Sequence, residues 1–156
     1  MKILVLSDTH GLHRKVKIPK EHIDLVIHSG DAAHSYDVNQ NKEELEDFLF
    51  WFSSLPIKHK IFVPGNHDLS LERGKVNSSN WEKVHVLIDE MIEIEDQVAP
   101  HLWNKVKIYG APWTPPFSPK QWAYTTKRTK IGNHWQDIPE CDILITHGPP
   151  YGILDI

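Results

Sequence analysis

Short runs of apolar residues recur along the chain, and each run is typical of a β-strand. The runs at 2–6 and 24–28 are almost continuously apolar, which is the pattern of a strand buried on both faces. The run at 91–95 alternates apolar and polar positions instead. The strands predicted in this way are residues 2–6, 24–28, 60–63, 84–88, 91–95, 106–109 and 142–146.

One segment has clear helical periodicity, and it predicts a helix from about residue 42 to residue 54. Asn41 is the predicted N-cap, with Glu44 three residues later as its capping-box partner. Pro56 is expected to end the helix, because proline cannot continue it. The apolar positions that repeat at the helical period are Leu45, Phe48, Leu49, Phe52 and Leu55.

A second helix is predicted to start at Ser118–Pro119, with proline at the first helical position. The segment that follows, to Trp135, lacks clean periodicity, so it is expected to be partly irregular. Strand, loop, helix and strand follow one another in the first half, which predicts a parallel α/β unit. Closely spaced strands between residues 84 and 109 predict a second sheet. With 156 residues and no internal repeat, the chain is expected to form a single domain, 1–156.

Composition and charge exclude some classes of protein but do not assign a function. A net charge of -4 and a pI near 6.2 give no electrostatic footprint for duplex nucleic acid. Cys141 is the single cysteine, which excludes an internal disulfide and fits a reducing compartment. The opening apolar run is too short for a signal peptide or a membrane span, so a cytoplasmic protein without membrane contact is expected. Eleven histidines prompt a search for metal-ligand spacing.

Polar side chains of the types that bind metals follow four of the predicted strands. In open α/β sheets ligands bind just beyond the carboxyl ends of the strands, so these side chains are expected to converge. Their oxygen and nitrogen atoms suit manganese, iron, zinc or magnesium, and the absence of thiolates argues against a structural zinc site. Turn chemistry alone explains any one of them, but it does not explain the set. The residues are Asp8, His10, Asp31, Asn66 and His147.

Local sequence predicts how these side chains are aimed. Asp8 and His10 are two residues apart, so both point to one face while the chain stays extended. Glycine precedes both Asp31 and Asn66, which allows a sharp turn at each strand end. His28 lies within a strand and is expected to be a hydrogen-bonded core histidine. Surface or structural roles are expected for His13, His22, His59, His85, His101 and His134.

The order of these motifs resembles that of the calcineurin-like metallophosphoesterases. The matching elements are Asp8-x-His10, Gly30-Asp31, Gly65-Asn66-His67-Asp68 and His147. The stretches 27–31, 108–113 and 144–150 are similar to the metallophosphoesterase-domain branch of that family, and the resemblance spans essentially the whole chain. It implies an α/β sandwich of two mixed β-sheets flanked by helices.

The same resemblance implies a centre of two divalent cations, manganese first, with iron, zinc or magnesium as alternatives. Asp8 and His10 would hold one cation, and Asn66 and His147 would hold the other. Asp31 would bridge the two. Such a pair activates a water molecule and stabilises the charge that develops on a phosphoryl oxygen.

Three residues are expected to contact a substrate. The resemblance implies that His67 protonates the leaving oxygen or steadies the phosphoryl group, next to Asn66. Trp113 is a candidate wall for a nucleobase, although packing against a hydrophobic edge explains it equally well. The basic cluster Lys127, Arg128 and Lys130 could touch a phosphate, but such clusters are usually solvated.

Two departures from the family pattern affect the expected activity. No Gly-His-x-His element follows His147, so each cation is expected to lack one ligand and the fold to be incomplete at its C-terminal side. His34 stands where many members have an acid, so the group that orients His67 is expected to differ.

Two functions stay open at this point. The first is a phosphodiesterase acting on nucleotides or cyclic nucleotides, with a small phosphoester as its substrate. The alternative is a truncated or split, non-catalytic remnant that binds metal weakly. An incomplete sheet edge would also favour association with a second copy or another partner.

Overall fold

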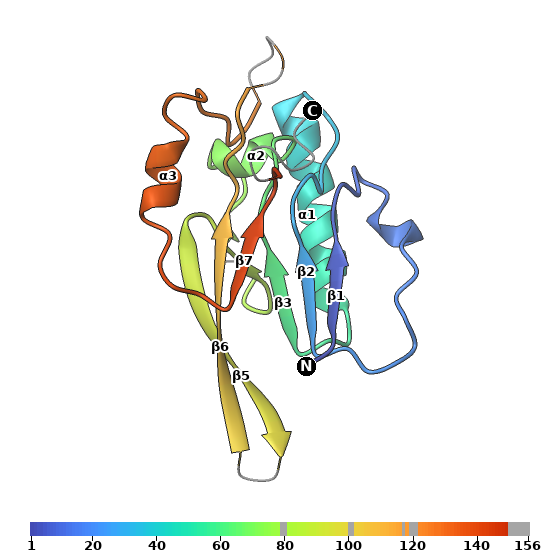
Figure 1. Cartoon of the computed structure of the whole chain (residues 1–156). Helices are drawn as coiled ribbons and strands as arrows, with labels where there is room; N and C mark the ends of the chain where they lie inside the picture. The colour runs from blue at the N-terminus through green and yellow to red at the C-terminus, as the bar shows by residue number, and fades with distance from the viewer. Residues whose placement is uncertain (79–80, 100–101, 117, 119–121, 150–156) are drawn as a thin grey trace.

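The computed structural model describes residues 1–78, 81–99, 102–116, 118 and 122–149, and these form two β-sheets with helices around them (Figure 1). The first sheet contains β1 (Ile3–Leu6), β2 (Leu25–His28), β3 (His59–Phe62) and β4 (His85–Val86). The second contains β5 (Glu90–Ala99), β6 (Leu102–Ala111) and β7 (Ile143–Thr146). The helical elements are η1 (His13–Lys15), α1 (Val38–Ser54), α2 (Leu69–Glu72) and α3 (Gly132–Gln136).

The topology of the two sheets places several strand ends together. The first sheet has the order β1-β2-β3-β4 and its strands are parallel, with Leu6 opposite His28 and His28 opposite Phe62. In the second sheet β5 pairs with β6 antiparallel, and β6 pairs with β7 parallel. Figure 1 shows β1, β2, β3 and β7 running in the same direction, so their carboxyl ends lie at one end of the molecule. The predicted fold of two sheets flanked by helices is confirmed, and among the described strands only the second sheet is mixed.

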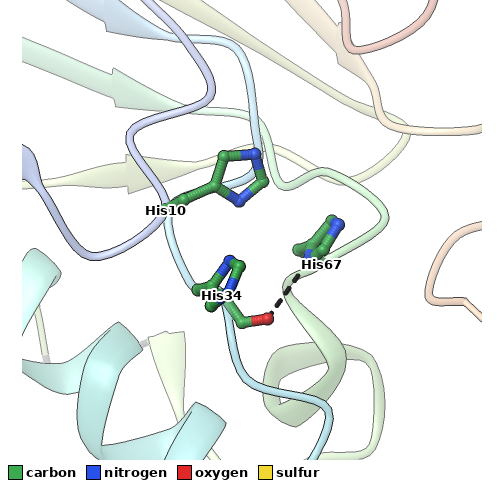
Figure 2. A group of neighbouring side chains, drawn as sticks. All are labelled: His10, His34 and His67. Carbon is green, nitrogen blue, oxygen red and sulfur yellow. Dashed lines mark hydrogen bonds between the residues drawn. The ribbon is translucent and has the colours of Figure 1, made fainter.

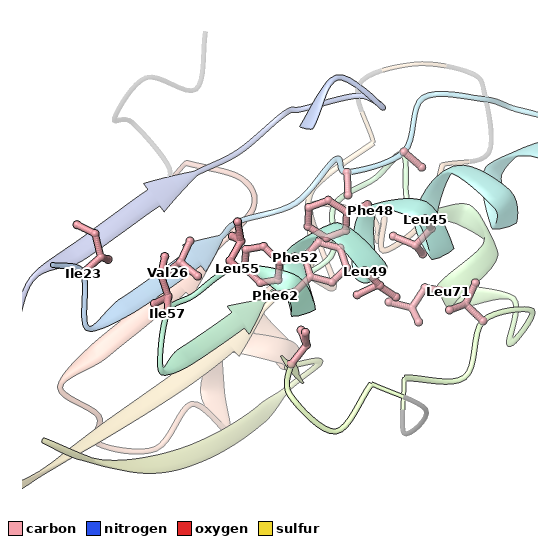
Figure 3. Packing of buried hydrophobic residues seen from close by; sticks show 14 residues of the cluster. Ile23, Val26, Leu45, Phe48, Leu49, Phe52, Leu55, Ile57, Phe62 and Leu71 are labelled. Atoms are coloured by element: carbon pink, nitrogen blue, oxygen red, sulfur yellow. The ribbon is translucent and has the colours of Figure 1, made fainter. Parts of the chain in front are cut away.

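Each face of the first sheet is covered by a different layer. On one face, α1 packs Leu45, Phe48, Leu49 and Phe52 against the strands, and all four side chains are fully buried (Figure 3). On the other face, Leu25, Ile27 and Ile61 pack against Ile94, Ile108 and Ile145 of the second sheet. A strand covered on both faces needs apolar residues at successive positions, which explains the unbroken run in β2.

Helix α1 begins four residues earlier than the sequence pattern predicts. Asp37 is the N-cap, and its carboxylate accepts hydrogen bonds from the N–H groups of Asn39 and Gln40. The predicted cap, Asn41, is a fully buried residue inside the helix. The prediction was wrong because the first helical turn is polar, so apolar periodicity gives no sign of it.

The second predicted helix is only partly within the described residues, because Pro119 lies outside them. In the described part of this segment, helical structure is confined to the short α3. None of the helices in the described ranges is long and apolar enough to cross a lipid bilayer.

Candidate metal centre

The loops after β1 and β2 stay paired beyond the strands, and this pairing builds one wall of the candidate site. The N–H of Asp8 donates to Gly30 O at 2.9 Å, and the N–H of His10 donates to Asp31 O at 3.0 Å. Asp8, His10 and Asp31 have φ angles of 53°, 42° and 57°, in the left-handed region that non-glycine residues rarely adopt. Strain of this kind persists only where surrounding contacts impose it, and it is concentrated at functional sites.

The conformation at Asp8 and His10 differs from the extended chain that the sequence analysis assumes. Two positive φ angles turn the backbone at both residues, so the alternation of a strand does not aim their side chains. The turn still brings the pair together, since His10 Nε2 lies 3.9 Å from Asp8 Oδ1.

Gly30 and Gly65 are required because the ends of β2 and β3 nearly touch. A Cβ atom on Gly30 would lie 2.8 Å from Gly65 Cα and would also collide with the His147 ring. A Cβ atom on Gly65 would lie 2.7 Å from His147 Cε1 and would collide with the Asp31 carboxylate. Gly30 also has a φ of 111°, which L-residues avoid.

Asp31 lies at the middle of the predicted ligand set. Its Oδ2 atom is 3.8 Å from His10 Nε2, on the side of Asp8. Its Oδ1 atom is 3.4 Å from His147 Nε2, and that nitrogen is 3.0 Å from Asn66 Oδ1. The structure therefore brings all five predicted ligands together, with one carboxylate oxygen of Asp31 facing each pair.

Main-chain carbonyls orient the three histidines of the site in the same way. The Nδ1 atoms of His10, His67 and His147 lie 3.1, 3.2 and 2.8 Å from the carbonyl oxygens of Ala33, His34 and Ser29. A carbonyl only accepts, so each Nδ1 carries the proton and each Nε2 presents a lone pair. Metal-binding histidines characteristically donate their second ring N–H in this manner.

One contact at the site is consistent with a cation. His147 Nε2 lies 3.0 Å from Asn66 Oδ1, and in the neutral tautomer that donates Nδ1–H to Ser29 O this nitrogen presents a lone pair to that oxygen. Two acceptor atoms at this separation repel each other unless a positive charge lies next to both. A divalent ion held by Asn66 and His147 would satisfy both atoms, so the residues present fit the metal.

Asp68 supports the site from beneath. Its fully buried carboxylate accepts backbone N–H bonds from Asp31, Ala32, Ala33 and Gly65, at 2.7–3.0 Å. Burial raises the pKa of Asp68 to about 7, and the N–H donors, Gly65 foremost, act in the opposite direction. This carboxylate ties the loop after β2 to the loop after β3, a structural role that the motif alone does not reveal.

His67 lies next to Asp31 and packs against aromatic rings. Its ring centroid is 4.2 Å from that of Trp122 and 5.7 Å from that of Tyr36. Burial lowers the pKa of His67, while Asp31 and the bond to the His34 carbonyl raise it. Its Nε2 atom is 4.0 Å from Asp31 Oδ2 and so faces the centre. As expected, no acid at position 34 orients this ring. The main-chain carbonyl of His34 orients it instead.

Asn41 and Glu44 hold the loops that carry these groups, and neither role is visible in the sequence. The amide of Asn41 donates to Ser35 O and His67 O at 2.8 and 2.7 Å, and its oxygen accepts from the N–H of Ser70. Glu44 accepts from the N–H groups of His34 and Ser35. Both side chains start on α1, so the helix fixes the loops on which the site is built.

His28 is a core residue, as predicted. It is fully buried beneath the site, its Nε2 atom is 3.0 Å from Thr9 Oγ1, and its Nδ1 accepts from the N–H of Gly30. Burial lowers the pKa of His28 to about 3. His28 is therefore neutral in the folded protein and supports the turn before Asp31.

A cavity of about 450 Å³ opens next to the predicted ligands. Asp8, Asn66 and His147 form one side of it. Its other walls are mostly apolar, with one guanidinium among them, and they comprise Thr114, Pro115, Arg128, Ile131, Trp135, Gly148 and Pro149.

Trp113 takes a different position from its two neighbours in the same loop. Its indole stacks on His134 with ring centroids 4.0 Å apart, and its Nε1–H donates to Asp89. Thr114 and Pro115 line the cavity, and Trp113 is not among the lining residues. A role for Trp113 in binding a nucleobase stays a prediction.

A comparison with known families agrees with the fold. The model of the calcineurin-like phosphoesterases matches residues 1–155, so the chain belongs to that family. Membership indicates metal-dependent hydrolysis of phosphoric esters as the chemistry of the family. The predicted resemblance is thereby confirmed.

Relatives point to a particular branch of the family. Human metallophosphoesterase domain-containing protein 1 is 31% identical over 173 residues, which cover 99% of this chain and 50% of that protein. A UPF0046 protein of Caenorhabditis elegans is 31% identical over 164 residues, covering 97% of this chain and 55% of that protein. The predicted metallophosphoesterase-domain branch is supported by both.

A third relative has a different name and a much greater length. Probable rhamnogalacturonate lyase C of Emericella nidulans is 32% identical over 160 residues, which cover 100% of this chain and 14% of that protein. The chain thus spans about half the length of the two relatives of its branch, and a small part of the third.

Proposed function

We propose that this chain carries the two-cation centre of a metal-dependent phosphodiesterase that acts on nucleotides or cyclic nucleotides. The observation that carries the proposal is the position of Asp31. Its two oxygens face two separate donor pairs, Asp8 with His10 and Asn66 with His147. A carboxylate placed in this way is the expected bridge between two cations.

The cavity beside the centre supports a small phosphodiester as the substrate. A volume of about 450 Å³ is within the range of small-molecule sites. Ile131, Trp135 and Pro115 offer apolar surface to a sugar or base. Arg128 is exposed and forms no ion pair within the described ranges, so it is free to contact a phosphate oxygen.

The residues of the chain have distinct parts in this scheme. Two divalent ions, with manganese first, would supply Lewis-acid activation of water and of the phosphoryl group. Asn66 contributes a neutral oxygen, which limits the negative charge facing an anionic substrate. His67 presents Nε2 toward the centre, with its Nδ1 proton fixed by His34 O. When protonated, Nε2 can donate its proton to the leaving oxygen.

The test combines bound metal with turnover. The purified chain is loaded with Mn²⁺, and the hydrolysis of bis(p-nitrophenyl) phosphate and of cyclic nucleotides is measured. Asp31→Asn should reduce both bound metal and rate. His67→Ala should keep its metal content and lose about 10²–10⁴ in rate, the usual contribution of a positioned acid.

Asp137→Asn, an exposed carboxylate outside the proposed ligand set, serves as the matched control and should behave as the original chain. Loss of metal from His67→Ala would show that His67 is a ligand instead of an acid. A chain that binds metal and hydrolyses none of these esters would favour the alternative, a non-catalytic remnant.

A further inference from the structure

Three imidazoles from three loops converge at the edge of the proposed two-cation centre. His10 follows β1, His34 follows β2, and His67 follows β3. Each of the three rings offers one nitrogen, and these atoms all lie within 4.8 Å of one another. Figure 2 shows the three side chains pointing into a common space. The family resemblance assigns no metal-binding role to His34, the position at which this chain departs from the pattern.

Two adjacent carbonyl groups prepare this cluster for a cation. Ala33 O accepts from His10 Nδ1 and His34 O accepts from His67 Nδ1, so both rings present the Nε2 lone pair. The segment that supplies both carbonyls also supplies the third imidazole. Glu44 holds that segment by accepting the N–H of His34, so its backbone is fixed while its side chain remains exposed.

We propose that His10, His34 and His67 form an additional, all-imidazole site for Zn²⁺ or a similar borderline cation. Three histidines with open remaining positions are an established ligand set for zinc, whereas carboxylate-rich sites favour manganese and magnesium. The rings of His34 and His67 are nearly parallel, with centroids 6.1 Å apart. In this arrangement the in-plane lone pairs of the two rings do not meet, so cation binding requires the exposed His34 side chain to rotate about its own bonds.

The site would compete with the proposed centre because it shares two residues with it. His10 belongs to both groups of side chains that could hold a cation, one with Asp8 and Asp31 and the other with His34 and His67, so its metal-binding nitrogen cannot serve two cations at once. A cation on His67 Nε2 would also remove that nitrogen from a substrate. Excess zinc should therefore inhibit hydrolysis by binding at the site that includes His34. This expectation rests on the proposed hydrolytic function.

The direct test is cation binding, which does not depend on turnover. The metal-free chain is titrated with Co²⁺, whose visible absorption reports nitrogen ligation, and with Zn²⁺ by calorimetry. The original chain should show a Co²⁺ band and one zinc event that weakens at least about tenfold in His34→Ala. His34→Gln should behave as His34→Ala does, since both keep the backbone N–H and carbonyl in place.

His85→Ala, which removes an exposed histidine outside the cluster, should leave the titration unchanged. Equal zinc affinity in the original chain and both His34 variants would overturn the site, whatever the hydrolytic activity proves to be. In the rate assay, zinc inhibition should be relieved in His34→Ala. Zinc binding that depends on His34 without any inhibition would overturn the competition while leaving the site standing.

Discussion

Main-chain groups, rather than other side chains, position most of the polar residues at the metal centre. Asp68 accepts four backbone N–H groups, and three carbonyls fix the rings of His10, His67 and His147. The residues that face the centre were predictable because each follows a strand. Supports such as Asn41 were not predictable, because a polar residue near a helix start is equally typical of a cap.

Asn41 offers a sharp test of these supports. Asn41→Asp replaces an amide that donates to two carbonyls with a group that, when ionised, only accepts. The buried carboxylate would then face Ser35 O and His67 O without a donor. We expect unfolding free energy to fall by about 3 kcal/mol, and metal affinity to weaken as the His67 loop loosens.

Urea unfolding and metal titration measure the two effects of Asn41→Asp. Asn39→Asp makes the same change at an exposed position of α1 and should alter neither quantity appreciably. Unchanged stability of Asn41→Asp would mean that the two hydrogen bonds donated by the Asn41 amide contribute little.

At the scale of elements, all seven predicted strands are present, and the errors lie at their ends and at the start of α1. β2 was predictable because burial on both faces demands continuous apolar sequence. β1 was predicted from the same pattern to be buried on both faces, and this was wrong, because Ile3 and Val5 are exposed. The pairing of β7 with β6, and the parallel order of the first sheet, depend on contacts between distant segments. Local pattern does not contain that information.

We propose that the outer edge of β7 mediates association. Among the described strands β7 pairs only with β6, and Leu144 on it is 48% exposed. Unpaired strand edges are templates for pairing with another chain, and a charged residue on the edge opposes this. Leu144→Lys should therefore shift sedimentation toward the monomer at concentrations where the original chain self-associates.

Phe50→Lys makes the same substitution at an exposed apolar position of α1 and should leave the association unchanged. A chain that is monomeric at every concentration, with or without Leu144→Lys, would contradict the proposed edge pairing.

For the whole molecule, the layer between α1 and the second sheet is also the floor of the metal centre. His28 lies in that layer, packed against Phe48 and hydrogen-bonded to Thr9 of the site loop. The sequence placed this histidine in a strand and in the core. It could not predict how strongly burial would oppose its protonation, because that depends on the helix packed over it.

His28 should make the stability of the fold depend on pH. Its pKa is lowered to about 3 in the folded protein, whereas in the unfolded chain the imidazole has its ordinary pKa of 6.5. Below pH 6.5 the unfolded state binds a proton that the folded state does not bind. The contribution of His28 to stability is therefore complete above pH 6.5 and falls as the pH decreases. Between pH 7 and pH 5 the loss should be about 2 kcal/mol from this group alone.

Urea unfolding at the two pH values, with a chelator present to exclude metal release, measures this loss. His28→Gln should flatten the dependence, even if it lowers stability overall. The exposed His22→Gln provides the control and should retain the original slope. An equally steep dependence in His28→Gln would assign it to other groups, such as His13, whose pKa burial also lowers.

The carbonyl groups that hold the three histidines have a consequence for how this protein can diversify. A peptide carbonyl is present whatever amino acid occupies the position, so substitution at residues 29, 33 or 34 leaves the acceptors for His147, His10 and His67 in place. Related sequences can therefore exchange the side chain at position 34, between an acid and an imidazole for example, without loosening the rings beside it. Saturation libraries at that position should yield mostly folded variants that differ in ion preference.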